Sequence, residues 1–397
     1  MINGKQNIKT NTPAIFNLGF RPFFLGASIF SIVTISLWFL VINNYVSLIV
    51  NNITLYQWHA HEMIYGYSIA VIAGFLLTAV RNWTGVQTLN GKPLAILFGL
   101  WVIARVLFLF GTQYLLYAAL FDLAFSLYLG IAIVTPIIKV KQWKQLGVLA
   151  KIILLTIGNI CFYLGFFGYM DNGVHIGIYG GLYLIIGLVM TIGRRVIPFF
   201  IERGVGYEIK LINYRWVDIS NLILILVFFI SELFLNNANL SAVMAFGLFI
   251  TNSTRLYFWH TPGIWKKPLL WSLFLSLMFI DLGFLLFALI PLLSISKFIA
   301  LHALAFGGIG IITLSMMSRV SLGHTGRNIN EPSVLIKYAL ILFSCGAVVR
   351  VFLPLVMMDY YLSWIVISQL LWITSFLLFA IVYTPILTQP RADGESG

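Results

Sequence analysis

The sequence predicts an all-α polytopic membrane protein with about twelve transmembrane helices. The chain has 397 residues, of which 60% are hydrophobic and only 9% are charged. Apolar runs of about twenty residues, each long enough to cross a hydrocarbon core of about 30 Å, recur from one end of the chain to the other. These runs lack the alternation of barrel strands, and a lipid-embedded backbone must satisfy its own hydrogen bonds, so helices are the expected elements.

The expected spans follow one another through short connections. No soluble domain or low-complexity tract interrupts them, so 1–397 is expected to form a single membrane domain. The polar first residues lead into the first span without a small-residue cleavage site, and no removable signal peptide is expected. The spans cover roughly residues 23–43, 59–80, 94–111, 113–138, 146–168, 173–193, 216–236, 239–257, 269–291, 297–318, 334–357 and 360–386.

The basic residues predict the orientation of the chain in the lipid bilayer. Nearly all lysines and arginines fall at the termini or after even-numbered spans, whereas the loops after odd-numbered spans hold almost none, Lys297 being the exception. The positive-inside rule therefore predicts cytoplasmic termini and external loops after the odd spans. The net charge of +12 is accordingly expected to reflect topology, and no nucleic-acid partner is expected.

A short pattern recurs at the histidines that open spans 2, 6 and 10. His61 in HEMIYG, His175 in HIGIYG and His302 in HALAFG are each followed by an aromatic residue at the fourth position and glycine at the fifth. A repeat of four spans predicts three pseudo-symmetric four-helix units. Chance matches in a chain rich in glycine and aromatic residues are the alternative explanation. The corresponding units would be residues 15–145, 146–260 and 261–390.

Four of the six histidines are expected at one depth. At 1.5 Å of rise per residue, His59, His61, His175 and His302 all lie within about two turns of the outer ends of their spans. An imidazole at this depth is by default a functional hypothesis, and its neutral nitrogen suits haem iron, copper or zinc. Helix capping and hydrogen bonds between helices are the alternatives.

The spacing of the histidines limits how they can share metal ions. Residues two positions apart on a helix point about 200° apart, so His59 and His61 cannot chelate one ion if both are helical. One centre built from His61 and His302, and a second using His59 and His175, is natural around a three-unit axis. Met63 could supply a thioether ligand for copper, although core packing is the simpler explanation.

Charged residues are expected inside the membrane at the same level. Arg105 and Arg350 occupy equivalent positions about 10 Å below the outer face, and buried charges usually pair. Arg105 is therefore expected to pair with Asp122, and Arg350 with Asp281. Alternatively, the guanidiniums neutralise an anionic ligand such as haem propionates. Glu62 is suited either to orienting a ligating imidazole or to facing solvent.

Several segments resemble the signature segments of the NnrS family, and they run in order over most of the chain. The resemblance implies a bacterial inner-membrane protein of about twelve spans that contains haem b and copper. It also implies a role in the response to nitric oxide and in protection against nitrosative stress. The segments are GFRPFF (19–24), WHAHEM (58–63), IAGFLLTAVRNWTG (72–85), GRRVIPFF (193–200) and SRVSLGHTGR (318–327).

The resemblance leaves the ligands unassigned, so the residue roles remain inferences from the pattern. His61, His302, Arg105 and Arg350 are the expected cofactor-binding residues. The expected ligands of a further metal ion are His59, His175 and Met63, and the metal sites are expected near the periplasmic face.

Three functions remain open at this point. The first is a haem- and copper-binding protein that handles nitric oxide or iron-nitrosyl species. The second is a nitric oxide reductase or quinol-linked oxidoreductase, which would take electrons from quinol or another donor because the chain lacks a C-x-x-C-H haem motif. Haem-copper oxidases share the plan of twelve spans but take copper ligands from span 7, which here lacks histidine, so oxygen reduction is not expected. A transporter is less favoured, since the repeat is parallel rather than inverted.

Overall fold

The computed structural model describes residues 13–48 and 50–395, and within these ranges it consists of helices and connecting loops without strands. Twelve long helical segments follow one another, each overlapping one expected span, which confirms the all-α polytopic fold. They are α1 (Phe20–Ile42); α2 (Leu55–His61), η2 (Glu62–Ser68) and α3 (Ile69–Thr84) joined end to end; α4 (Gly91–Leu109); α5 (Leu115–Lys139); α6 (Leu146–Phe166); α7 (Gly173–Gly204); α8 (Arg215–Ile230) with η5 (Ser231–Leu235); α9 (Ala238–Trp259); α10 (Pro268–Leu293); α11 (Lys297–His302), η7 (Ala303–Gly310) and α12 (Ile311–Gly323) joined end to end; α13 (Val334–Val351) with α14 (Leu353–Val356); and α15 (Tyr361–Thr388).

Eleven of these segments are long and apolar enough to cross a membrane. The remaining one, α9, has sufficient length, but its second half contains the polar run Thr251 to Arg255, which lowers its mean hydropathy. Its neighbours α8 and α10 both pack against it, so it is covered on those sides by apolar helices. The chain is therefore built as a multi-pass membrane protein.

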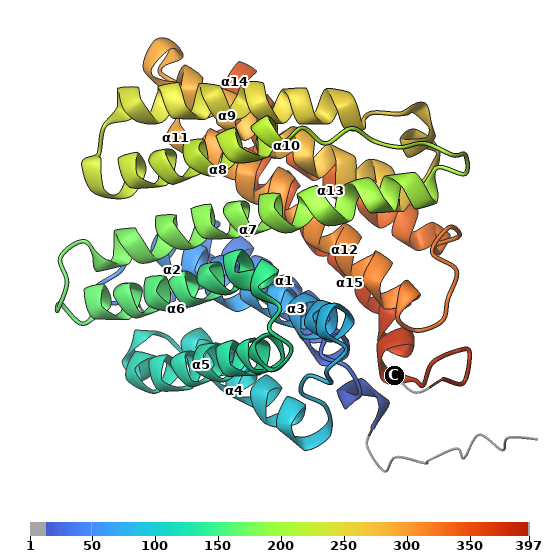
Figure 1. Ribbon diagram of the computed structural model, residues 1–397. Helices are drawn as coiled ribbons and strands as arrows, with labels where there is room; N and C mark the ends of the chain where they lie inside the picture. Colours follow the sequence, from blue (N-terminus) through green and yellow to red (C-terminus); the bar gives the residue numbers. More distant parts are fainter. Residues whose placement is uncertain (1–12, 49, 396–397) are drawn as a thin grey trace, which may run out of the picture.

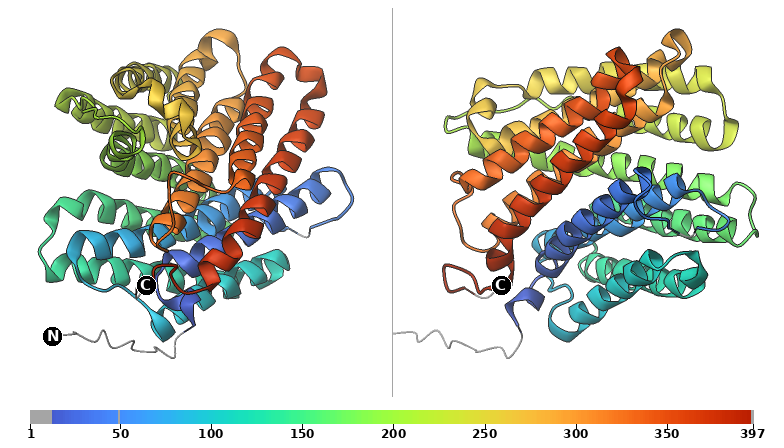
Figure 2. Two further views of the ribbon diagram at one scale, coloured as in Figure 1. Left: turned by 90° about the vertical axis from the view of Figure 1, so that its right-hand side faces the viewer. Right: turned by 180° about the vertical axis from the view of Figure 1, so that it is seen from behind.

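The first and last helices lie side by side, as the blue and red ribbons in Figure 2 show. Near the start of α1, the Arg21 guanidinium donates to the carbonyl of Leu387, at 3.0 Å, at the end of α15. Further along, the Trp372 indole donates to Ser31 Oγ at 2.6 Å. These two contacts show that α1 and α15 run antiparallel. Figure 1 shows α8 and α9 on one side of α7, and α4 and α5 on its other side.

The two segments that follow His61 and His302 have the same local structure. In each case the α-helix ends at the histidine and continues as a π-helical stretch, η2 or η7. The glycine of the recurring pattern is packed against an aromatic ring of the preceding span: a Cβ atom at Gly66 would overlap the ring of Phe30, and one at Gly307 the ring of Phe279. π-Helical stretches within α-helices frequently mark functional sites.

The segment after His175 is different, because α7 continues as a regular α-helix. The helices α9 and α10 also pack closely across the expected boundary between the second and third units. The arrangement as three pseudo-symmetric units therefore stays a prediction, with local similarity between the first and third segments.

Candidate functional site

The first buried charge cluster, which we call the Arg105 network, lies between α4, η2 and α5. Arg105 Nη1 forms an ion pair with Glu62 Oε1. Arg105 Nη2 forms a second ion pair with Asp122 Oδ1, at 2.7 Å, although the geometry is not that of a hydrogen bond. The three side chains are at most 2% exposed. The expected pairing of Arg105 with Asp122 is confirmed, and Glu62 is a second carboxylate on the same guanidinium.

His61 is part of the Arg105 network. Its Nδ1 lies 3.0 Å from Glu62 Oε1, and its Nε2 lies 3.0 Å from Asn159 Oδ1 in α6. The orientation of the Asn159 amide follows from its Nδ2, which donates to Asp122 Oδ2 at 2.9 Å. Both ring nitrogens of His61 therefore face oxygen atoms that accept. Both ring nitrogens are therefore engaged, and a metal ion would have to displace one of these contacts.

Aromatic residues pack around His61 and Asp122 of the Arg105 network. The ring of His61 stacks on Phe108 with centroids 4.7 Å apart and lies 4.1 Å from Phe162. Tyr163 donates a hydrogen bond of 2.8 Å to Asp122 Oδ2. The sequence analysis did not single out Tyr163. The spacing of Asn159 and Tyr163, four residues apart and therefore on one face of a helix, is the signal that could have found it.

Carboxylates of the chain neutralise the guanidinium of the Arg105 network. Glu62 and Asp122 both lie against Arg105, and their oxygens also contact His61 and Asn159. A buried cation whose counter-charges are provided by the chain itself needs no anionic ligand.

The second cluster, which we call the Arg350 site, has a different composition. The guanidinium of Arg350 in α13 lies 3.2 Å from His302 Nε2, and its two Nη atoms lie 3.3 and 3.4 Å from the hydroxyl of Tyr361 in α15. The Arg350 side chain is only 7% exposed. Within residues 13–48 and 50–395, it forms no ion pair with a carboxylate.

The expected pair between Arg350 and Asp281 is wrong. Asp281 in α10 accepts a hydrogen bond of 2.6 Å from Ser253 in α9. Both residues lie at a suitable depth, but Asp281 is on the side of α10 that faces α9, whereas Arg350 faces His302 and Tyr361. Depth along a helix follows from sequence distance, but the direction of a side chain around the helix depends on packing.

Two imidazoles belong to the Arg350 site. His302 Nδ1 donates to the carbonyl of Phe298 at 2.6 Å, which leaves Nε2 as an acceptor that faces Arg350. His59 stacks on Trp38 of α1, with ring centroids 4.7 Å apart and planes 8° from parallel. His59 interacts electrostatically with both Arg350 and His302. The Nδ1 atom of His59 is buried and has no hydrogen-bond partner.

The structure thus groups the expected ligands differently from the sequence analysis. His61 faces α4 and α6, whereas His302 faces α13 and α15, and His59 associates with His302. His175 lies against Tyr179 with ring centroids 4.5 Å apart, and its Nε2 is buried without a partner.

Met63 packs against the hydrophobic core. Among the residues that the structure describes, no three His, Cys, Asp or Glu side chains form a group that could hold a metal ion. The metal-binding roles of the histidines and Met63 stay predictions.

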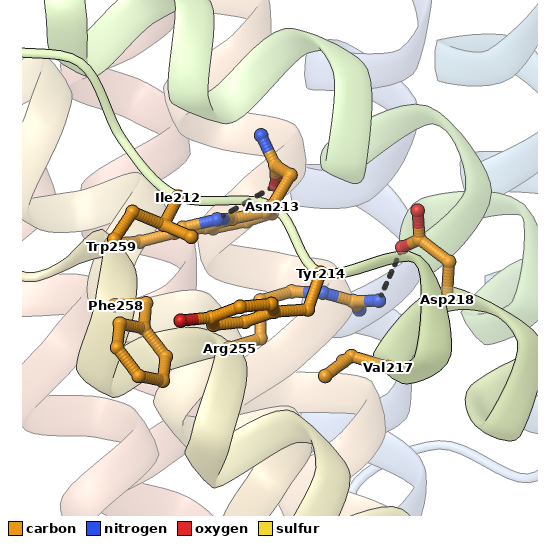
Figure 3. Close-up of a pocket in the computed structure, with 8 residues that line it drawn as sticks. All are labelled: Ile212, Asn213, Tyr214, Val217, Asp218, Arg255, Phe258 and Trp259. Atoms are coloured by element: carbon orange, nitrogen blue, oxygen red, sulfur yellow. Dashed lines mark hydrogen bonds and ion pairs between the residues drawn. The ribbon is translucent and has the colours of Figure 1, made fainter.

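A small pocket at the opposite end of the helices is a weaker candidate. Figure 3 shows Arg255 of α9 reaching Asp218 of α8, at 3.0 Å, and the Trp259 indole donating to Asn213, also at 3.0 Å. Asp218 also accepts a hydrogen bond of 2.7 Å from Arg194 of α7. These contacts join α7, α8 and α9, and no histidine lines the pocket. We interpret it as a structural junction.

A family model described as NnrS protein matches residues 14–391, a range that includes both the Arg105 network and the Arg350 site. No curated protein matches the chain.

Proposed function

The chain belongs to the NnrS family, and we propose that it is a bacterial inner-membrane protein of the nitric oxide response that binds haem b and copper. We assign the haem to the Arg350 site. The observation that carries this assignment is the presence there of two half-buried imidazoles, His59 and His302, beside a buried guanidinium that has no carboxylate partner in the described part of the chain.

The donor set of the Arg350 site fits a haem. His302 has the arrangement common in metal-binding histidines, in which Nδ1 donates to a carbonyl and Nε2 is left as the ligand. His59 offers a buried Nδ1 with no other partner. Haem iron takes one or two axial ligands from the protein, and histidine is the most frequent. The fork of Arg350 matches a propionate carboxylate.

The Arg105 network fits a haem poorly, although the sequence pattern had suggested His61 as a ligand. Both nitrogens of His61 are engaged with Glu62 and Asn159, and a metal ion would have to displace one of these bonds. We propose that this network stabilises the packing of η2 against α4, α5 and α6, and that His61 has a structural role in it.

The described residues contain no candidate copper site comparable to the Arg350 site. Within the described ranges there is no group of three ligating side chains, and Met63 packs in the core. His175, with its unpartnered Nε2, is the remaining imidazole at that end of the molecule. We therefore keep copper as part of the proposal on the resemblance alone and derive no step through it.

The residues of the Arg350 site would hold and shield the cofactor. Haem iron, when bound, supplies the coordination position at which nitric oxide binds. Trp38 holds the ring of His59 by stacking, and the carbonyl of Phe298 fixes the tautomer of His302. Tyr361 positions the guanidinium of Arg350. The surrounding helices exclude water, which strengthens every electrostatic contact inside the site.

Haem content tests the assignment. We expect purified wild-type protein to show a Soret band, His302→Ala to lose it, and His59→Ala to lose or shift it. His260→Ala is the matched control, because His260 is exposed and bonds only Trp265 in the loop after α9. Addition of nitric oxide to the reduced protein should shift the band. Haem-free wild-type protein, or unchanged spectra in both variants, would contradict the assignment.

The positions of the lysines and arginines support an orientation with the Arg350 site near the periplasmic face and both termini in the cytoplasm. A reporter enzyme that is active only in the periplasm, fused after the last residue, should be inactive. Fusion in the loop between α1 and α2 should give activity. The reverse result would contradict the orientation.

A further inference from the structure

We propose that Arg350, Thr34 and Gln369 form the binding site of a small, planar, singly charged anion. The inference depends on the charge and hydrogen-bond balance of the Arg350 site and not on the proposed haem. A free oxyanion and the carboxylate of a bound molecule share the required chemistry.

The Arg350 site carries a net positive charge, which favours the binding of an anion. Arg350 is buried, and its nearest polar neighbours are the Nε2 of His302 and the hydroxyl of Tyr361, both uncharged. A buried cation without a counter-charge is strongly unfavourable in a membrane protein. One negative charge would neutralise the site, whereas a doubly charged anion would leave a buried negative charge.

Unpartnered polar atoms lie nearby on α1 and α15. Thr34 is fully buried, and its hydroxyl has no hydrogen-bond partner, unlike Thr78 in α3, which donates to a carbonyl of its own helix. Gln369 is 5% exposed, and neither its amide nitrogen nor its amide oxygen has a partner. An unsatisfied buried polar group is unfavourable, and a bound ligand that supplies its partner would remove this cost.

The register of α1 and α15 places these two residues at one level. The helices are antiparallel, and Ser31 bonds Trp372 across their interface. Three residues further along α1 is Thr34, and three residues back along α15 is Gln369, so both lie one turn beyond this bond in the same direction. A further turn along α1 leads to Trp38, on which His59 stacks. The unpartnered atoms therefore lie one turn beyond the Ser31–Trp372 bond, in the direction of Trp38 and His59.

The donors select the shape of the ligand. A guanidinium binds a planar oxyanion through two parallel N–H bonds, which a spherical halide cannot accept in the same way. The amide of Gln369 and the hydroxyl of Thr34 can each donate one further bond. Nitrate and formate have the required charge, planarity and acceptor oxygens.

Thermal stability of the full-length protein in detergent tests this site. Nitrate or formate, titrated into haem-free protein, should raise the Tm, with a midpoint at least tenfold below that of chloride or sulfate. Arg350→Met should abolish the selective shift, and Gln369→Leu and Thr34→Val should each raise the midpoint about tenfold. Asn221→Leu is the matched control, since Asn221 in α8 is another buried amide with an unpartnered oxygen. It should leave the midpoint unchanged.

The same variants distinguish a ligand site from an interface between α1 and α15 that binds no ligand and leaves polar groups without hydrogen-bond partners. If the interface is empty, Gln369→Leu removes an unsatisfied polar group and should raise the Tm at every anion concentration, with no selective response in the wild type. That result would overturn the proposal. A response in haem-free protein that disappears after haem loading would identify a carboxylate of the cofactor as the anion. A Tm shift that persists in both haem-free and haem-loaded protein would identify a free ion. The titration of haem-free protein remains a valid test of the anion site even if the protein binds no haem.

Discussion

The Arg105 network and the Arg350 site are built on the same local plan but have opposite charge balance. In both, a histidine ends an α-helix and a π-helical stretch follows. An arginine of the next span contacts the imidazole itself at His302, and the carboxylate of Glu62 beside the imidazole at His61. The difference begins at one position: Glu62 follows His61, whereas Ala303 follows His302. The first site is neutralised by its own carboxylates. The second is left with an unpaired guanidinium, and we attribute ligand binding to that excess charge.

The difference between the two sites shows that a buried arginine is not by itself evidence for a ligand. Arg105 is as deeply buried as Arg350, yet two carboxylates of the chain lie against it. Breaking such a matched set is costly because it leaves uncompensated charges in a medium of low polarity. Removing an arginine that has no carboxylate partner does not have this cost. The two sites should therefore respond differently to equivalent substitutions.

The largest effect is expected for Arg105→Met. The substitution leaves Glu62 and Asp122 buried without their counter-charge, and we expect a loss of about 3–5 kcal/mol in the free energy of unfolding. Denaturant unfolding in one detergent, followed by tryptophan fluorescence, measures the loss. A decrease below about 1 kcal/mol would show that the network is not the balanced set described.

A smaller effect is expected for Asn159→Leu. The amide of Asn159 connects His61 Nε2 with Asp122, and its removal leaves Nε2 without its partner and Asp122 Oδ2 with the bond from Tyr163 alone. We expect a loss of about 1–3 kcal/mol by the same measurement. Asn252→Leu is a suitable control, because the Asn252 Nδ2 donates only within α9. Equal losses in the two variants would argue against a special role of the network.

A small effect on stability is expected for Arg350→Met. No carboxylate loses its partner, and only the contacts to His302 and Tyr361 are removed. In the absence of ligands we expect no loss greater than about 1 kcal/mol, because the variant also removes a buried charge that has no counter-charge. A loss as large as that of Arg105→Met would mean that the Arg350 site also contains a compensating charge.

The smallest effect is expected at the exposed pair near the C-terminus. The hydrogen bond from Arg391 lowers the pKa of Asp393 to about 2 from its ordinary value of 3.8, so the carboxylate stays ionised at neutral pH. The contribution of a carboxylate with a lowered pKa is present above the ordinary value and is lost as the pH falls towards 2. Because the pair faces solvent, Asp393→Asn should leave the Tm at pH 7 unchanged within error. A measurable decrease would show that the pair helps to fix the segment after α15.

The sequence was sufficient to predict the helices and one of the two sites in outline. Membrane spans are encoded by long apolar runs, and these runs correspond to α1 through α15 with only local adjustments. The pair between Arg105 and Asp122 was also predictable, because both residues lie at one depth on neighbouring spans. Twelve spans in this order leave few other partners within reach.

The grouping of the histidines was not predictable, and the reason is geometric. A π-helical stretch rotates the side chains before it, here the histidines, relative to the side chains after it. The pattern HEMIYG does not reveal such a stretch in advance. Thr34, Gln369 and Tyr361 were missed because hydroxyl and amide residues are common in membrane helices and become informative only when their partners are known. The antiparallel contact of α1 with α15 brings residues more than three hundred positions apart into one interface.

The most direct test of the account is the amount of haem per folded monomer in Arg105→Met and Arg350→Met, with folded protein measured by size-exclusion chromatography. We expect Arg105→Met to yield less folded protein but to keep the wild-type haem ratio in the fraction that folds. Arg350→Met should yield as much folded protein as the wild type but with a reduced haem ratio. The opposite pattern, with haem lost from Arg105→Met and retained in Arg350→Met, would contradict the assignment of ligand binding to the Arg350 site.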